Sequence, residues 1–142
     1  MILVDANLII YAHNEDVVQH VAAQEWFAHV LSGKEIVALP WTVVHTFLRL
    51  TTGGRVFAKT LPIEQSLRIV DRWLAVPHVK ILEPGPQYWD ILRRLCIASR
   101  VRGKVLSDAH LAALAIEHDA TMYTTDADFR RFTGLRVLNP LV

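Results

Sequence analysis

Met1-Ile2-Leu3-Val4-Asp5-Ala6-Asn7 opens the chain with a short apolar run that ends on a carboxylate. Such a continuous apolar run is typical of a parallel strand that is covered on both faces. The residues after Asn7 are expected to begin a helix, because Asp and Asn are favoured at helix N-termini. Asp5 is therefore predicted at the carboxyl end of a strand, where open α/β sheets bind ligands. Taken alone, Asp5 is better explained as a cap or turn residue, because Asp commonly caps helices.

The size and composition of the chain indicate one globular domain. At 142 residues, 52% of them hydrophobic, the chain can bury a single core. No apolar run approaches the roughly 18 residues of a membrane span, and no secretory signal is recognisable at the start. The single Cys96 cannot form an internal disulfide, which fits a reducing compartment. These features predict a cytoplasmic protein without a membrane anchor.

Apolar periodicity divides the rest of the chain into alternating helices and strands. Helices are expected at about 17–32, 41–52, 62–76, 88–99, 107–118 and 128–132, and strands at 35–39, 79–82, 120–124 and 136–138. This alternation indicates a central, mostly parallel sheet flanked by helices. No repeat, low-complexity segment or linker divides the chain, so we expect a single α/β domain over residues 1–142.

Charge is distributed unevenly although the net charge is only +1. Residues 1–48 carry one basic and five acidic side chains, and residues 105–142 carry three basic and five acidic ones. Between them, residues 49–104 carry eleven basic and four acidic side chains. If the two acidic ends converge, the chain combines an acidic site with a basic surround, as metal and phosphate chemistry requires. For most individual Lys and Arg side chains, an ordinary solvated helix face is the better explanation.

Asp108 is expected at the same edge of the sheet as Asp5. It lies in the first turn of the helix predicted over 107–118, and helix N-termini share an edge with the carboxyl ends of parallel strands. A structural explanation exists, since Ser107 would cap this helix and an acidic residue would complement its dipole.

Asp126 is the third acidic residue expected at this edge, because it directly follows the predicted strand over 120–124. Thr125 with Asp128 three residues later would form a variant capping box, which is the structural alternative. Three carboxylates together repel one another, so a cluster needs protonation or a cation. Hard oxygen ligands without a zinc-like Cys or His spacing favour Mg²⁺, with Mn²⁺ also possible.

The histidines give no metal site of their own. His110 and His118 are eight residues apart on one helix, too far for a shared metal, and are expected in packing or surface roles.

Three stretches resemble the acidic blocks of the PIN domain, in the order in which that family carries them. They are Met1–Asn7, Leu106–Ala112 and Thr124–Phe129. The resemblance is strongest to VapC-type toxins of bacterial toxin–antitoxin pairs and covers the full chain. It implies a three-layer PIN-like fold and an Mg²⁺-dependent endoribonuclease that cuts structured RNA such as tRNA or ribosomal RNA. It also implies a homodimer and a small cognate antitoxin whose tail fills the acidic groove.

The resemblance assigns Asp5 and Asp108 as the principal metal ligands and Asp126 as a further acid of the site. Metal-activated water would attack the phosphodiester. Supporting roles fall to Asn7, Thr46, Thr125 and Asp128. Candidates to grip RNA phosphates are the basic residues Arg49, Arg55, Lys59, Arg100, Arg102 and Lys104.

Thr46 departs from the family pattern. PIN domains usually carry a Glu early in the helix after the second strand, and Thr46 stands at that place. Thr46 forms hydrogen bonds but supplies no charge, which leaves open whether one or two metals bind. Two alternatives therefore stay open: a catalytically weakened PIN-like module that binds RNA or antitoxin, and a phosphatase of the haloacid-dehalogenase type. The phosphatase motif requires a second Asp where this chain has Asn7.

Overall fold

The computed structural model describes residues 1–142, and its five strands form one parallel sheet in the order β3-β2-β1-β4-β5. The strands are β1 (Ile2–Val4), β2 (Val37–Pro40), β3 (Val79–Leu82), β4 (Thr121–Tyr123) and β5 (Arg136–Leu138). β1 lies at the centre and is buried along its whole length, as its uninterrupted apolar sequence predicts. The mostly parallel sheet expected from the sequence is confirmed, and every strand pair in it is parallel.

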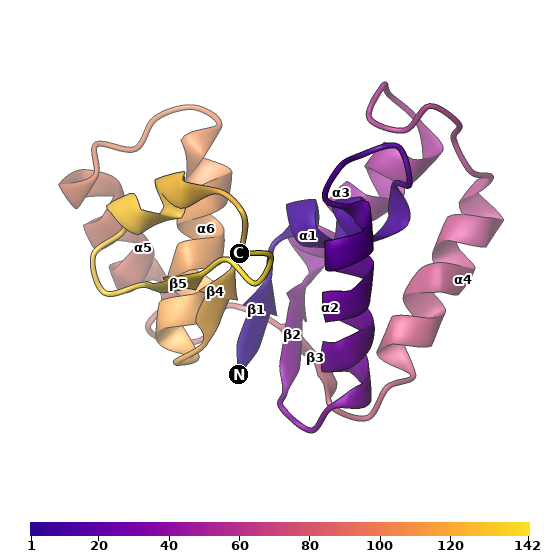
Figure 1. Ribbon diagram of the computed structural model, residues 1–142. Coiled ribbons are helices and arrows are strands. Elements are labelled where there is room, and N and C mark those ends of the chain that lie inside the picture. The colour runs from indigo at the N-terminus through magenta and orange to yellow at the C-terminus, as the bar shows by residue number, and fades with distance from the viewer.

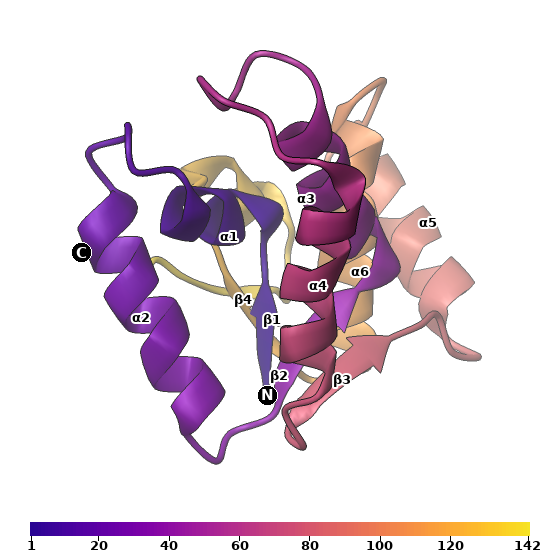
Figure 2. The ribbon, with the colours of Figure 1, turned by 90° about the vertical axis from the view of Figure 1, so that its right-hand side faces the viewer.

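Helices cover both faces of this sheet, which gives the three layers expected of a PIN-like fold. They are α1 (Ala6–His13), α2 (His20–Ser32), α3 (Trp41–Thr52), α4 (Ile63–Leu74), α5 (Tyr88–Ala98) and α6 (Val105–Glu117), with a short 3₁₀ helix η1 (Ala127–Arg131). Figure 2 shows α1 and α2 on one side of the central strands and α5 and α6 on the other. In Figure 1 the carboxyl end of β1 points towards the top, where the α3–α4 and α5–α6 loops also lie.

Two helices begin two or three residues away from their predicted starts. α2 begins at His20, three residues after the predicted start, because the preceding turn is held by its own hydrogen bonds. The Asn14 Oδ1 atom accepts from the Asp16 amide at 3.2 Å, and His20 Nδ1 bonds the Tyr11 carbonyl at 2.9 Å.

α6 begins earlier than predicted, at Val105, and this changes the role of Ser107. Amide bonds from Leu106 to the Gly103 carbonyl and from Ser107 to the Lys104 carbonyl already form the first turn. Ser107 is therefore the third residue of the helix, and the prediction that it is the cap is wrong.

The hydrophobic residues build one core of 31 buried side chains that draws on both halves of the chain. No helix is long and apolar enough to cross a membrane.

Candidate active site

Asp5 connects the carboxyl end of β1 to the start of α1. Its backbone angles (φ −74°, ψ 149°) place it at the N-cap position, yet its side chain makes no capping hydrogen bond. Instead, the Asp5 Oδ2 atom accepts a hydrogen bond from Thr124 Oγ1 at 2.7 Å. Asp5 therefore occupies the cap position of α1 without capping the helix through its side chain, and its carboxylate is held by Thr124.

Thr124 is the centre of the hydrogen-bond network around Asp5. β1 and β4 are in register with Val4 opposite Tyr123, which places the buried Thr124 beside Asp5. The Thr124 hydroxyl also accepts from the Asp126 amide at 3.0 Å and from Asn7 Nδ2 at 3.3 Å. With both acceptor positions filled, its only proton is directed to Asp5.

Asn7 and Thr125 support this network from behind. Asn7 Nδ2 donates to Thr125 Oγ1 at 3.0 Å as well as to Thr124, so it acts on Asp5 through Thr124 rather than by direct contact. The Asn7 Oδ1 atom is buried and has no hydrogen-bond partner in the protein.

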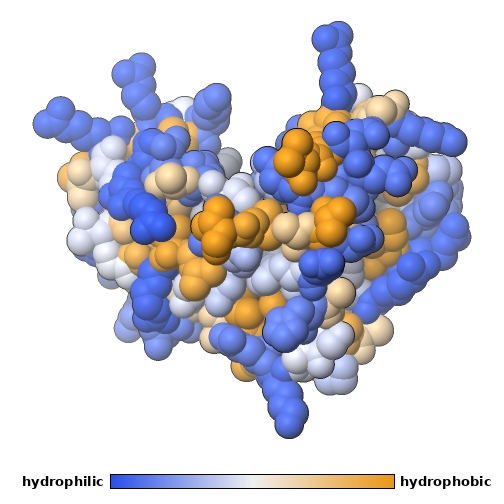
Figure 3. Space-filling model, viewed as in Figure 1, coloured by the Kyte–Doolittle hydropathy of each residue, from blue (hydrophilic) through white to orange (hydrophobic).

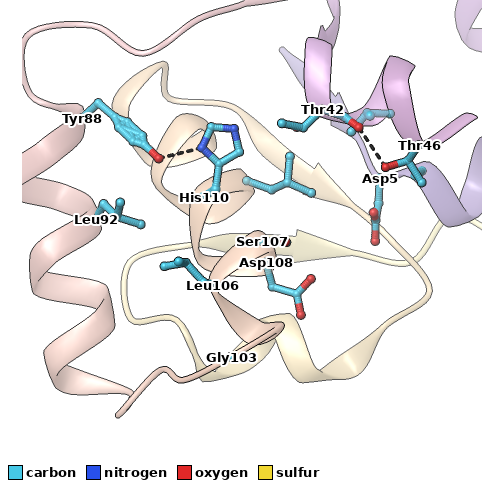
Figure 4. A pocket seen from close by; sticks show the side chains of 13 residues that line it. Asp5, Thr42, Thr46, Tyr88, Leu92, Gly103, Leu106, Ser107, Asp108 and His110 are labelled. Atoms are coloured by element: carbon cyan, nitrogen blue, oxygen red, sulfur yellow. Dashed lines mark hydrogen bonds between the residues drawn. The ribbon is translucent and has the colours of Figure 1, made fainter. Parts of the chain in front are cut away.

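A pocket of about 570 Å³ opens in front of Asp5 and contains Asp108 in its wall. It lies between α3 on one side and α5 with α6 on the other (Figure 4). Figure 3 shows that the molecular surface is hollowed between the two halves of the molecule. The structure thus joins two carboxylates that are 103 positions apart in the sequence.

The electrostatics of the edge show that its three predicted acids affect one another. Burial raises the pKa of Asp5 to about 6, and the charges of Asp108 and Asp126 add to this effect while the Thr124 hydrogen bond opposes it. Burial also raises the pKa of Asp108, followed by the charge of Asp126. This edge therefore disfavours negative charge and would gain from a bound cation.

Asp126 has a structural as well as an electrostatic role. Its Oδ1 atom accepts from the Asp128 amide at 2.9 Å and so caps η1, whereas the capping box expected to begin at Thr125 does not form. The Asp128 side chain is exposed and lies 3.9 Å from Arg131, three residues later. Asp128 therefore faces solvent.

Thr46 lines the same pocket as Asp5, but its hydroxyl donates to the Thr42 carbonyl of its own helix at 2.8 Å. No carboxylate occupies this wall of the pocket.

The carboxylates suit a hard divalent cation chemically, in an open arrangement. No group of three or more His, Cys, Asp or Glu side chains lies close enough together to hold a metal ion. The structure therefore does not place the three predicted ligands in one compact set. Mg²⁺ is usually bound through one or two carboxylates and keeps several waters. Asp5 and Asp108, which share a pocket, fit that donor set, with Asp126 adding charge from outside the pocket lining.

The six basic candidates are all exposed, and none forms an ion pair within the chain. They fall into two groups on different loops. Arg49, Arg55 and Lys59 lie at the end of α3 and on the α3–α4 loop, while Arg100, Arg102 and Lys104 lie between α5 and α6.

Three residues of the site were not identified from the sequence. Thr124 would have required the β1–β4 register, because only that register places it beside Asp5. Tyr88 and His110 come from α5 and α6, and their side chains meet at 2.6 Å between Tyr88 Oη and His110 Nδ1 in the pocket wall. His110 thus has the packing role that was predicted, and it also lines the pocket, which the sequence did not indicate. His118, in contrast, bonds the Glu83 carbonyl at the surface.

Almost the entire chain matches one known protein family. The PIN domain profile matches residues 2–135. Ribonuclease VapC37 of Mycobacterium tuberculosis is 38% identical over 136 residues, which cover 96% of this chain and 94% of that protein. Ribonuclease VapC25 of the same organism is 34% identical and covers 99% of both chains.

Solved structures show the same fold at lower identity. VapBC2 from Rickettsia felis, bound to a promoter DNA fragment, aligns with a TM-score of 0.69 at 20% identity over 98% of both chains. The sarcin–ricin-loop-cleaving toxin VapC20 of Mycobacterium tuberculosis aligns with a TM-score of 0.62 at 20% identity, over 96% of this chain and 99% of the other.

Proposed function

The chain belongs to the PIN-domain family, among the VapC-type ribonucleases, and we propose that it cuts a structured RNA, such as tRNA or ribosomal RNA, with the help of Mg²⁺. Mn²⁺ would serve in the same way. The observation that carries this proposal is the Asp5 carboxylate, which is oriented by Thr124 and shares a pocket with Asp108. Its pKa of about 6 reflects an arrangement that favours a positively charged ligand.

The residues of the site divide the work of phosphodiester hydrolysis. Asp5 and Asp108 would hold the cation, and Asp126 adds negative charge beside them. When bound, Mg²⁺ supplies activation of water and neutralisation of charge on the phosphate. Thr124 keeps Asp5 in a single orientation through its only proton, and Asn7 in turn fixes Thr124. Because these groups are preorganised by the sheet, little reorganisation is needed when RNA binds.

Phosphate binding falls to the two basic groups on the α3–α4 and α5–α6 loops. Their side chains are exposed and not neutralised by ion pairs, so they are available to RNA phosphates. Such contacts position a nucleic acid without reading its sequence. We expect them to supply the salt-dependent part of RNA affinity.

The test of this proposal is cleavage of total RNA by the purified protein in Mg²⁺. We expect discrete fragments, no fragments with EDTA, and a loss of cleavage of at least about a hundredfold in Asp5→Asn, since a catalytic cation contributes several kcal/mol. Asp71→Asn, which changes an exposed carboxylate on α4, is the matched control and should cut like the parent. Equal cleavage by Asp5→Asn and the parent would overturn the mechanism.

The same experiment separates the alternatives. RNA or antitoxin binding without cleavage in any divalent cation would indicate a binding module, as the missing carboxylate at Thr46 allows. The phosphatase alternative has no support at its second position, because Asn7 donates to Thr124 and Thr125 and supplies no carboxylate.

We further propose a homodimer that works in the cytoplasm and is inhibited by a small cognate antitoxin. The support is the family and the relatives named VapC ribonucleases. If a small protein is encoded beside this gene, its co-expression should yield a complex without RNA cleavage. Light scattering of the free protein should give twice the mass of 16.1 kDa.

A further inference from the structure

We propose that the part of the pocket beyond Asp108 is a nucleobase subsite, in which Tyr88 and His110 bind one unpaired base of the RNA. This inference rests on the proposed function, because the base would belong to a nucleotide beside the cleaved phosphate. It adds a contact that determines specificity to a site whose acidic residues act only on the phosphate, through a bound cation.

The pocket has two chemically different ends. Asp5, Thr42 and Thr46 form one end, and Asp108 lies between it and the other (Figure 4). The opposite end is built from side chains of α5 and α6, among them Tyr88, Leu92, Leu106 and His110 (Figure 4). A cation and a phosphate would occupy only the end that contains Asp5. The apolar end needs a flat, largely apolar ligand, and a nucleobase attached to that phosphate has this character.

The volume and lining agree with such a ligand. About 570 Å³ lies within the range of small-molecule sites, which are mostly apolar with a few placed polar groups. Proteins that read RNA sequence bind unpaired bases by stacking on aromatic rings, including His, and by hydrogen bonds to the base edge. The apolar end offers both kinds of contact.

Tyr88 and His110 present a preorganised polar group within this apolar wall. The 2.6 Å contact between Tyr88 Oη and His110 Nδ1 fixes the imidazole ring. The other ring nitrogen, Nε2, has no hydrogen-bond partner in the chain and is not among the fully buried atoms. One nitrogen is thus held in place and left open to a ligand, which is the geometry that distinguishes one base edge from another.

The loop beside the subsite can accommodate the RNA backbone. Gly103 lines the pocket in a left-handed conformation (φ +60°), and no heavy atom lies within 4 Å of where a Cβ would be. The exposed Arg102 and Lys104 flank this open backbone. A nucleotide can therefore place its base in the pocket and its phosphate near the positively charged side chains of Arg102 and Lys104.

A purely structural explanation competes with this proposal, because the Tyr88–His110 bond also joins α5 to α6. The two explanations predict different losses. If the bond is only a structural link, its removal lowers the melting temperature and reduces the cleavage of all substrates equally. If the pair contacts a base, its removal changes the preference among bases, while the melting temperature of the conservative variant Tyr88→Phe stays close to that of the parent.

The first test measures binding without catalysis. The four ribonucleoside 5′-monophosphates are titrated into metal-free protein while NMR follows the methyl groups of Leu92, Leu106 and Leu111 and the His110 ring. We expect one base to bind more tightly than the others. Tyr88→Phe should weaken it about threefold to tenfold and His110→Ala about tenfold or more. Trp89→Ala, an exposed aromatic of the same helix outside the pocket, should bind like the parent. Absence of shifts at these groups, or shifts that both variants retain, would overturn the proposal.

The second test connects the subsite to cleavage. RNA hairpins carry each of the four bases in turn at the positions beside the mapped cut. The parent should prefer one base at one position, and His110→Ala should reduce that preference about tenfold. Equal loss on all four hairpins, with a lower melting temperature, would establish the structural link instead. If the parent cuts no RNA, the proposed nuclease function fails, and monophosphate binding still decides whether the subsite exists.

Discussion

The two ends of α6 hold carboxylates in opposite ways. At the C-terminal end, Glu117 is only 8% exposed and accepts hydrogen bonds from the amides of Gly85 at 2.7 Å and Gln87 at 2.9 Å. At the N-terminal end, Asp108 accepts no hydrogen bond within the chain, and burial with the charge of Asp126 raises its pKa. The Glu117 carboxylate has its hydrogen-bond partners within the protein, whereas the Asp108 carboxylate has none and would be stabilised by a cation.

This difference separates a structural acid from a functional one. Backbone amides around Glu117 replace the water lost on burial, so the side chain anchors the β3–α5 turn to α6. Asp5 and Asp108 are partly buried next to like charges, which costs stability in the absence of a ligand. Such a cost is characteristic of sites that bind a cation.

The largest expected contrast concerns RNA cleavage. Asp108→Asn should reduce the cleavage rate by about 10²–10⁴-fold, because it removes one of two carboxylates available to the cation. Glu117→Gln changes the same helix by the same chemical step and should cut within about twofold of the parent once folded. Single-turnover rates on one defined RNA measure both. Similar losses of cleavage rate in the two variants would show that any change in α6 impairs cleavage, and would contradict the distinction between a functional Asp108 and a structural Glu117.

Stability should show the reverse pattern. Glu117→Ala leaves the Gly85 and Gln87 amides without their acceptor and should lower the free energy of unfolding by about 2–4 kcal/mol. Glu117→Gln retains one acceptor oxygen and should lose less. Urea unfolding at pH 7 gives these values. An unchanged midpoint for Glu117→Ala would mean that water replaces the carboxylate at no cost.

Asp5→Asn should stabilise the protein while abolishing its proposed activity. Because folding raises the pKa of Asp5 from 3.8 to about 6, the folded state binds more protons between pH 4 and pH 6, and the Asp5 contribution falls as pH rises through this window. Asp5→Asn escapes this cost and should gain up to roughly 3 kcal/mol over the parent above pH 6.

Well below the unfolded-state pKa of 3.8 the difference between the two proteins should no longer change with pH, since Asp5 is then protonated in both the folded and unfolded states. Unfolding in EDTA at several pH values tests the difference between parent and variant, in which the titration of other groups cancels. A difference that does not change with pH would contradict the assigned environment of Asp5.

Gly85→Ala should have the smallest effect of the series. A Cβ at this position would lie 2.7 Å from Glu117 Oε2, so Glu117 must shift and strain its bonds. We expect a loss of about 1–2 kcal/mol. The same substitution in a Glu117→Ala background should cost less, because the Cβ no longer meets a carboxylate. Equal costs in both backgrounds would locate the strain in the turn itself.

Local patterns in the sequence were sufficient to predict the fold. Apolar runs and helical periodicity located every strand and helix to within a few residues, because these patterns depend on neighbours in the chain. Helix boundaries were less certain. The beginning of α6 at Val105 rather than at Ser107 depended on the Gly103–Lys104 turn, which has no simple capping signature.

The sequence by itself determined the α/β alternation and placed Asp5, Asp108 and Asp126 at one edge of the sheet, because the carboxyl ends of parallel strands and the starts of their helices share that edge. Only the tertiary structure decided how these acids are used. The Thr124–Asp5 bond joins residues 119 positions apart, and the Tyr88–His110 contact depends on how α5 packs against α6. The openness of the carboxylate set depends likewise on strand register and helix packing. Register and packing arise from the whole core, so no local pattern specifies them.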